Sequence, residues 1–321
     1  MQAQEIKNKR VLISPLNWGY GHLSRCISII DILLKNNNVV FFAGKKSDFT
    51  ILREYFSNEI NYIQHTPYPF IFNSSGFRIS DFIRSLIPLI KCYKQELKTV
   101  SLLVEEHKIN VVISDHRYGF RTAKCSSIFI THQCNLPIHR IAWPIQLFHR
   151  FLIKKFNEVW IMDDKKKRLA GKLSESLGPM CHYIGIHSRF ADSINSERKK
   201  DIEGILLVSG PIEFSPALVS HFRDTFNEIK EPKYIVGSSE LLSILPLEFS
   251  NYFKPNNLWR ETDDLLLRTK LILSYCGYST LMDLELLKCK AILIATEGQS
   301  EQIYLAKKQK ASVNDYGFLI F

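Results

Sequence analysis

The sequence contains no uncharged apolar run that approaches the ~18 residues needed to span a bilayer. Its opening, Met-Gln-Ala-Gln-Glu-Ile-Lys, lacks the apolar core of a secretory signal peptide. Its seven cysteines show neither CxxC nor paired spacing, which argues against a zinc site and against a disulfide framework. We therefore expect a cytoplasmic protein in a reducing compartment.

Two motifs of common cofactor enzymes are incomplete. Gly19-Tyr-Gly21 is only a fragment of the dinucleotide fingerprint GxGxxG, because Ser24 stands where its last glycine is required. No acidic residue ends the second predicted strand, at Ala43–Lys46, so a nicotinamide cofactor is disfavoured. No DxD pair stands at a predicted strand end, and Asp163-Asp164 runs directly into four basic residues. We expect neither a bound metal nor a cofactor.

The composition is that of an ordinary globular protein. Its 321 residues are enough for two domains, each with its own core. A hydrophobic content of 45% with 23% charged residues is typical of a folded chain and not of a disordered one. The formal net charge of +10 favours anionic partners, namely a nucleotide diphosphate, an acidic membrane surface or nucleic acid.

The N-terminal stretch predicts a βαβ unit. The apolar runs 11–13 and 39–43 are typical of short buried strands, and the segment between them has helical apolar spacing. The glycine-rich loop after the first strand delivers Gly21 and His22 to the start of this helix. An imidazole titrates near neutral pH and suits general base catalysis. The alternative is a capping histidine or one at the edge of the core.

Two later strands of this half end in polar residues, as strands do at α/β sites. The run 111–114 leads into Asp115 and His116, and the run 128–130 leads into Thr131–Asn135, which includes His132. Asp115 or His116 is placed to contact an acceptor hydroxyl; equally, Asp115 is suited to cap a following helix. We interpret 158–162 as the last strand of this half.

Two segments of the same half mix large apolar and aromatic residues with basic ones. The first spans 68–98, where we expect Pro88 to bend or restart a helix, and the second spans 138–156. Basic, aromatic, amphipathic segments suit the interfacial layer of an anionic membrane. The alternative is an ordinary core helix with a solvated face or, for the second segment, a crossover helix.

A polar stretch without periodicity at 185–201 predicts a domain boundary, which we place between 190 and 191. A second α/β series begins at 205–208 and is followed by Ser209 and Gly210. This order of strand and glycine mirrors the N-terminal unit. Two α/β halves with polar loops at their strand ends predict a cleft between them.

The most informative stretch lies near the end of the chain. A strand at 271–273 precedes the turn Gly277–Thr280, with Asp283 one turn into a helix, and a strand at 291–295 precedes the polar loop Thr296–Gln302. The N–H groups of a helix start, with the hydroxyls of the turn, make an anion site, and Asp283 is placed to accept hydrogen bonds from a ribose diol. The alternative is a capped helix whose carboxylate only complements the dipole.

Gly277–Asp283 followed by Glu297–Gln302 resembles the donor-nucleotide half of GT-B glycosyltransferases, most closely family 28 and its MurG-type members. Matching segments run from about residue 11 to about residue 306. The resemblance implies an α/β fold, GT-B, of two Rossmann-like doubly wound domains that face each other across a cleft. Residues 1–190 would form the acceptor-side domain, and residues 191–321 the donor-nucleotide domain.

The resemblance also implies roles for individual residues. The turn holds the diphosphate, an acidic residue on the next helix holds the ribose, and a later acidic/Gln pair contacts the donor sugar. His22 is the candidate base, and Asp115 is the second candidate or the group that orients it. The donor-binding candidates are Gly21, Ser209, Gly210, Gly277, Tyr278, Ser279, Thr280, Asp283, Gln299, Glu301 and Gln302. The acceptor-side candidates are His116, His132 and Asn135.

We therefore expect an inverting, metal-independent transfer of a hexose or N-acetylhexosamine from a UDP-sugar to a hydroxyl of a glycan or lipid-linked acceptor. Because several members of this family dock on membranes through a hydrophobic and basic patch, we expect peripheral association with the inner face of the membrane, and no nucleic-acid partner. The alternatives are a UDP-sugar 2-epimerase, for which we find no paired carboxylates, and a non-catalytic module that binds membrane surfaces. Family members usually continue with a long helix that returns to the N-terminal half, and here we expect that element to be short or missing.

Overall fold

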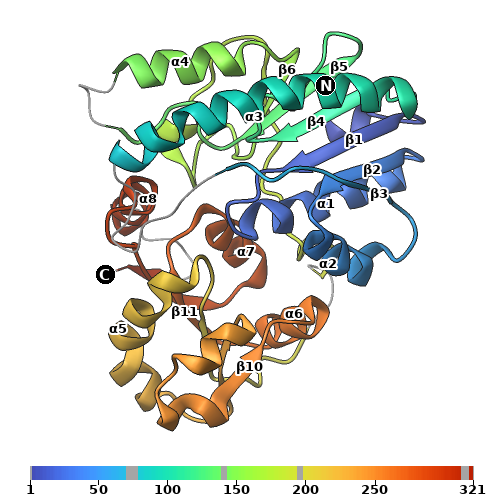
Figure 1. Cartoon of the computed structure of the whole chain (residues 1–321). Coiled ribbons are helices and arrows are strands. Elements are labelled where there is room, and N and C mark those ends of the chain that lie inside the picture. Colours follow the sequence, from blue (N-terminus) through green and yellow to red (C-terminus); the bar gives the residue numbers. More distant parts are fainter. Residues whose placement is uncertain (1, 70–78, 139–142, 194–197, 312–317, 321) are drawn as a thin grey trace. The chain divides into compact units, whose positions relative to one another are not determined.

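The computed structural model describes residues 2–69, 79–138, 143–193, 198–311 and 318–320. The chain divides into two compact units (Figure 1). Among the described residues, unit 1 ends at Arg189 and unit 2 begins at Phe190. Each unit is an α/β domain built on one sheet whose paired strands are parallel, which confirms the predicted fold class.

Unit 1 has a seven-stranded sheet in the order β3-β2-β1-β4-β5-β6-β7. Its strands are β1 (Arg10–Pro15), β2 (Val39–Gly44), β3 (Asn61–Gln64), β4 (Val111–Asp115), β5 (Ser126–Thr131), β6 (Glu158–Ile161) and β7 (Cys181–Tyr183). Its helices are α1 (Gly21–Lys35), α2 (Lys46–Phe56), α3 (Ile79–Glu106) and α4 (Trp143–Ile153). The strand order changes direction between β1 and β4, which is where open α/β sheets place their ligands.

The strand register shows that α3 and α4 cover the same face of this sheet. Leu12 aligns with Val112, and Ser114, two residues further along β4, aligns with Phe129. Neighbouring residues of parallel strands point the same way, so these four side chains share a face. Helix α3 packs on Leu12 and Val112, whereas Ile153 of α4 packs on Phe129. Both helices therefore belong to one outer layer, visible in the upper part of Figure 1.

Unit 2 has a six-stranded sheet in the order β10-β9-β8-β11-β12-β13. Its strands are β8 (Gly204–Leu207), β9 (Lys233–Gly237), β10 (Phe253–Pro255), β11 (Leu271–Tyr275), β12 (Lys290–Ile294) and β13 (Phe318–Ile320). Its helices are α5 (Ser215–Glu228), α6 (Trp259–Leu267), α7 (Tyr278–Leu287) and α8 (Ser300–Ala311). Leu218, Phe222 and Phe226 of α5 pack on β8, β9 and β11 to form its main core cluster. Short 3₁₀ helices lie at 3–5, 171–174, 191–193, 212–214, 239–243 and 247–252.

One expectation about these elements was wrong, and one of the two alternatives given for Pro88 is ruled out. The strand at 158–161 is not the last of unit 1, because β7 adds to its edge after a long irregular segment. Helix α3 does not restart at Pro88 but runs through it as one element. Pro88 is exposed, so water can hydrogen-bond the carbonyl that loses its helical partner.

Two buried histidines tie helices of unit 1 to its loops. His149 of α4 lies with Nδ1 2.7 Å from the Tyr118 hydroxyl and Nε2 2.8 Å from the Gln133 carbonyl oxygen. His187 lies with Nδ1 3.2 Å from the Ser28 hydroxyl of α1 and Nε2 3.2 Å from the Ile184 carbonyl oxygen. Burial lowers the pKa of each ring to about 4, so both are neutral at neutral pH.

Candidate functional site

The residues that follow β1 and β4 meet at one edge of the unit 1 sheet. These strands are parallel neighbours, so their carboxyl ends coincide. Gly19 has a φ of 93°, which a side chain would disfavour, and this turn carries the chain from β1 into α1. Gly21 and His22 are therefore the first residues of that helix. After β4, His116 also has a positive φ, 61°, which is uncommon for a residue other than glycine and frequent at functional sites.

His22 and Asp115 form a close pair at this edge. The His22 Nδ1 atom lies 3.0 Å from Asp115 Oδ2, and the side chains are 17% and 0% exposed, respectively. Asp115 is thus too deeply buried to contact an acceptor, and no helix follows it for it to cap, because residues 116–125 lead to β5 through turns. The arrangement instead suits a carboxylate that orients a partly exposed imidazole.

Arg25, one turn after His22 on α1, is a buried member of this cluster that sequence reasoning missed. Its Nε donates to Asp115 Oδ2 at 2.7 Å, and its Nη2 donates to Asp115 Oδ1, so it grips both carboxylate oxygens. The same guanidinium lies 2.6 Å from His22 Nδ1 and 3.2 Å from His132 Nδ1. The only signal in the sequence was a basic residue three positions after His22. It did not indicate a buried site residue, because charged residues are usually exposed.

The charges of this cluster favour an ionised Asp115 and a neutral His22. Burial raises the pKa of Asp115, but Arg25 and His22 outweigh it and hold that pKa well below its usual range. Burial and the Arg25 charge lower the pKa of His22 by more than Asp115 raises it. At neutral pH the pair is therefore a carboxylate beside an imidazole that is able to accept a proton.

The three acceptor-side candidates occupy different positions. The His116 ring lies edge-on to the His22 ring, with centroids 5.3 Å apart, and its Nε2 has no hydrogen-bond partner among the described residues. His132 is buried, with Nδ1 near Arg25 and Nε2 3.2 Å from the Gln133 amide. Asn135 donates to the Lys172 carbonyl and accepts from Arg150, so it secures its loop. Contact of any of the three with an acceptor stays a prediction.

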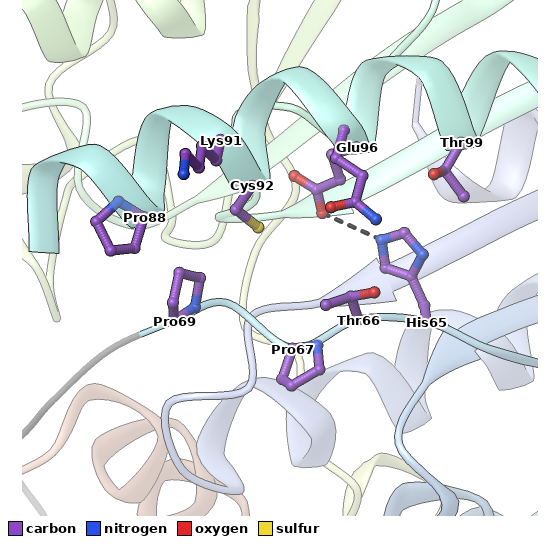
Figure 2. Close-up of a pocket in the computed structure, with 10 residues that line it drawn as sticks. His65, Thr66, Pro67, Pro69, Pro88, Lys91, Cys92, Glu96 and Thr99 are labelled. Atoms are coloured by element: carbon purple, nitrogen blue, oxygen red, sulfur yellow. Dashed lines mark hydrogen bonds and ion pairs between the residues drawn. The ribbon is translucent and has the colours of Figure 1, made fainter.

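A cavity of about 230 Å³ lies at the same sheet edge, between α3 and the segment that follows β3 (Figure 2). Glu96 and His65 are buried beside it, with Glu96 Oε1 3.3 Å from His65 Nε2. Arg117 donates through Nε to the same carboxylate oxygen at 2.6 Å, and through Nη2 to the Thr66 carbonyl at 2.7 Å. This buried network, which the sequence did not reveal, fixes one wall of the cavity. Lys91 lines the cavity as well and is exposed.

In unit 2 the predicted donor loops also gather at one sheet edge. Strands β8, β11 and β12 are parallel neighbours, and Tyr275 aligns with Ile294 where β11 and β12 end. Ser209 and Gly210 follow β8 on the exposed surface, and Gly210 has a φ of 97°. Gly277 follows β11 as the N-cap of α7, so the turn predicted to bind phosphate does open a helix.

Neither the backbone conformation nor the packing requires a glycine at position 277. Its φ of −83° and ψ of 151° are open to any residue, and a Cβ added there would meet only the Thr280 hydroxyl, at 3.6 Å. Ser279 and Thr280 are half-buried at the start of the helix, whereas the Tyr278 side chain is only 3% exposed. The buried ring of Tyr278 is therefore unsuited to contact a ligand, and the prediction for this residue is limited to its backbone. Asp283 is half-buried in the second turn of the helix.

The loop before α8 is held by its own side chains. Gln302 Oε1 accepts from the Thr296 N–H and hydroxyl, both at 2.9 Å, and its Nε2 donates to Gln299 Oε1 at 2.8 Å. Burial raises the pKa of Cys276, at the end of β11, to about 12, and the Glu301 charge contributes to this rise. The Cys276 N–H donates to the Ile294 carbonyl oxygen at 2.7 Å, so the two predicted donor loops begin side by side.

Within the described ranges no three histidine, cysteine, aspartate or glutamate side chains converge on a point that suits a metal ion. The adjacent acids in unit 1 have other partners. Asp163 is buried and accepts from the Ala170 N–H and the Ser174 hydroxyl, and Asp164 pairs with Arg168. The seven cysteines are all free.

Helix α4 exposes a continuous apolar face. Trp143, Leu147, Phe148 and Phe151 are each more than half exposed and recur at spacings of one face of a helix. His149 and Ile153 hold the opposite side against unit 1. Parts of the other predicted patch, at 70–78, lie outside the described residues, but Ile87 and Ile90 of α3 are exposed near Lys91 and Lys94 in the sequence. Over the part of the chain that the structure covers, no helix is both long and apolar enough to cross a membrane.

Comparison with known proteins finds no family model and no curated protein that matches. Solved structures do match. The glycotransferase of kitacinnamycin superposes with a TM-score of 0.62 at 14% identity, covering 94% of this chain and 84% of that one. Spinosyn rhamnosyltransferase SpnG superposes with a TM-score of 0.58, and MurG of Acinetobacter baumannii with a TM-score of 0.52, both at 12% identity. Each match covers 97% of this chain and 86% of the other chain. SpnG has also been solved with thymidine diphosphate and with spinosyn aglycone. The chain therefore has the GT-B fold, as predicted.

Proposed function

We propose that this chain is a glycosyltransferase that moves a hexose or N-acetylhexosamine from a UDP-sugar to an acceptor hydroxyl, with inversion at the anomeric carbon. The observation that carries the proposal is the partly exposed His22, backed by the buried Asp115 carboxylate at the strand-end edge of unit 1. The fold supports it, since the similar structures include a rhamnosyltransferase and MurG.

In the proposed reaction, unit 1 supplies the base. His22 Nε2 takes the proton of the acceptor hydroxyl while the oxygen attacks the anomeric carbon, and the bond from that carbon to the diphosphate breaks. The bonding electron pair leaves with UDP, and the proton remains on His22. The Asp115 carboxylate, 3.0 Å from Nδ1, stabilises the resulting imidazolium. A single displacement of this kind inverts the configuration.

Unit 2 would bind the donor. The start of α7 combines backbone N–H groups, the positive end of the helix dipole and the half-buried hydroxyls of Ser279 and Thr280, which together suit a diphosphate. Asp283 would accept from the ribose diol. Glu301 and Gln302 would contact sugar hydroxyls. Gln302 Oε1 already accepts two hydrogen bonds from Thr296, so Gln302 would either bind the sugar while keeping these bonds or give them up.

Stabilisation of the departing diphosphate by this helix start would replace a metal ion. We therefore propose that transfer requires no divalent cation and survives EDTA. A strict requirement for added Mg²⁺ or Mn²⁺, measured as product formed after dialysis against chelator, would overturn this part of the proposal.

On the acceptor side we propose a lipid-linked or glycan acceptor at an anionic membrane surface. The exposed apolar face of α4 is accompanied by Arg150, Lys154 and Lys155, which gives the apolar and basic mixture of an interfacial helix. Lys155 Nζ lies 4.3 Å from the centroid of the Phe151 ring, so charge and aromatic surface are contiguous there. The cavity beside Glu96 is the site in unit 1 where we expect part of the acceptor to bind.

A thermal-shift screen of nucleotide sugars tests the proposal. Binding raises stability by RT ln(1+[L]/Kd), so a ligand at ~100 times its Kd contributes about 2.7 kcal/mol. We expect UDP and one or more UDP-sugars to raise the melting temperature, and other nucleotides to do so less. Donor incubated alone should yield no epimerised sugar, which separates transfer from 2-epimerisation. No stabilisation by any nucleotide would favour a non-catalytic membrane protein instead.

A further inference from the structure

Arg25 is among the largest fully buried side chains of the protein, and it sits at the centre of the cluster around His22. It reaches Asp115 with two nitrogens, which is the bidentate geometry that a guanidinium prefers with a carboxylate. A buried carboxylate without such a partner tends to take up a proton. Arg25 therefore accounts for how Asp115, which is 0% exposed, stays charged.

The same side chain also acts on His22 through space. A guanidinium has only hydrogen-bond donors, and Arg25 Nη2 lies 2.6 Å from His22 Nδ1. An N–H of Arg25 and a hydrogen on His22 Nδ1 would therefore compete for the space between these two nitrogens. If Nδ1 carries the hydrogen, it faces Asp115 Oδ2 and leaves Nε2 free to act as base. If Nδ1 accepts from Arg25, the hydrogen moves to Nε2 and the ring cannot accept a proton there. Arg25 thus influences both the charge and the tautomer of the imidazole.

We propose that Arg25 is a positioning residue for the transfer reaction: by clamping Asp115 it keeps that carboxylate charged and aimed at His22, while its own charge keeps the imidazole unprotonated. This inference rests on the proposed role of His22 as base. The charged and titratable groups around that ring are Arg25 and Cys26 on α1, Asp115 and His116 at the end of β4, and His132 after β5. Of these, Arg25 is the permanent cation.

The sign of the effect follows from the contacts. Burial lowers the pKa of His22 most, the Arg25 charge lowers it further, and Asp115 raises it. Removing the cation takes away one of the two effects that lower this pKa, so the pKa of His22 should rise. The rate should then fall near pH 7 and recover as the pH rises, whereas loss of a purely structural arginine would lower the rate at every pH.

The test compares Arg25→Met, Arg25→Lys and the control Arg117→Met. Arg117 is equally buried, at 2%, and also pairs with a buried carboxylate, that of Glu96. Its hydrogen bonds go to Glu96, Pro15 and Thr66, and not to His22. In ¹⁵N-labelled protein, the imidazole spectrum reports the tautomer and titration of His22 without any substrate, with His22→Asn used to assign the signal. We expect the His22 midpoint in Arg25→Met to rise by about one pH unit or more, with Arg25→Lys closer to wild type and Arg117→Met unchanged.

Activity provides the second readout. In Arg25→Met the acid limb of the profile of kcat/KM against pH should move to higher pH together with the midpoint of His22. Most of the rate should return at pH values above that midpoint. A midpoint and tautomer that do not change in either Arg25 variant would overturn the inference. If Arg25→Met fails to fold, Arg25→Lys decides through the tautomer of His22: lysine keeps the charge but loses the bidentate contact with Asp115, so a changed tautomer supports the inference and an unchanged one overturns it. If the spectra shift as expected but no nucleotide sugar is ever turned over, the positioning role stands and the proposed function fails.

Discussion

At the scale of single residues, the proposed chemistry depends on one imidazole. His22→Ala should lower turnover by roughly 10²–10⁴-fold and leave the donor complex nearly intact, because a base acts in the transition state and not on bound UDP. His22→Asn is the sharper variant, since it keeps a polar side chain without a titratable nitrogen. Steady-state kinetics beside UDP calorimetry would separate the two effects.

Two outcomes would revise this assignment. Near-normal turnover in His22→Asn would mean that the base lies elsewhere, and His116, whose ring is in edge contact with His22, would be tested next. A fall in melting temperature together with lost UDP affinity would instead indicate a structural histidine. Asp115→Asn should resemble the loss of His22 in rate, because the ring would lose the carboxylate that orients it.

The sequence predicted His22 and Asp115 as site candidates but not Arg25, the cation that contacts both. Strand ends and glycine-rich turns leave local signals, and they predicted that the candidate residues would gather at one edge of the sheet, as they do. Arg25, and likewise the pair of Glu96 and Arg117, are charged side chains inside the core, where a pattern of apolar spacing predicts none. Their pairing joins positions 90 and 21 residues apart, which a single sequence does not reveal.

At the scale of elements, the start of α7 makes a distinct prediction. Gly277→Ala should weaken UDP binding by about tenfold or more while costing the fold at most about 1 kcal/mol. Within the protein the added Cβ meets only the Thr280 hydroxyl, at an ordinary contact distance of 3.6 Å, whereas in the proposed complex it would meet the phosphate. Calorimetry and thermal melting measure the two quantities. Gly204→Ala is the matched control: its Cβ would lie 2.8 Å from Ile229 Cδ1, so it should lower stability and spare UDP affinity.

The Asp283 assignment is tested in the same assay. Asp283→Ala should reduce UDP affinity by about 1–3 kcal/mol through loss of a charged acceptor for the ribose. If its affinity for UDP equals that of wild type while Gly277→Ala binds weakly, the turn holds phosphate but the ribose lies elsewhere. If neither variant changes UDP binding, α7 is only a capped helix.

Helix α4 carries the prediction about membranes. The protein should sediment with anionic vesicles at low salt and be released as salt rises, because screening weakens the attraction of the basic residues. Phe148→Ser combined with Phe151→Ser should abolish most of this binding, since both side chains are more than half exposed. Leu247→Ser is the control, as Leu247 is 91% exposed in unit 2. Equally poor capture by neutral and anionic vesicles would contradict the membrane proposal.

Most long elements were predictable because buried parallel strands are continuous apolar runs. The short edge strands were not. Strand β7 has only three residues, all half-buried, and β10 has three residues that include Lys254 and Pro255, so neither shows an apolar run. Helix α3 continues through Pro88 because the proline is on the solvent side, a fact of tertiary placement that local rules do not contain.

At the scale of the whole molecule, the histidines are unevenly distributed. Nine of the ten precede residue 190, and His221 is the other. His149 and His187 are buried and neutral, and the pKa of each is about 4 against an ordinary value of 6.5. In the unfolded chain these two rings therefore bind protons below about pH 6.5, whereas in folded unit 1 they stay neutral until about pH 4. The stability of unit 1 should fall across that window, by up to about 3 kcal/mol for each ring.

The two halves of the protein should consequently differ in their tolerance of acid. We expect a calorimetric scan to broaden or split as the pH falls from 7 to 4.5, with the transition of unit 2 the less affected. His187→Gln, which can still bond Ser28 and the Ile184 carbonyl but does not titrate, should move the earlier transition back toward its neutral-pH temperature. A single transition that shifts as one at every pH would show that the halves melt together. If the two transitions separate as expected, acidification of the cell would unfold unit 1 first and leave unit 2 folded.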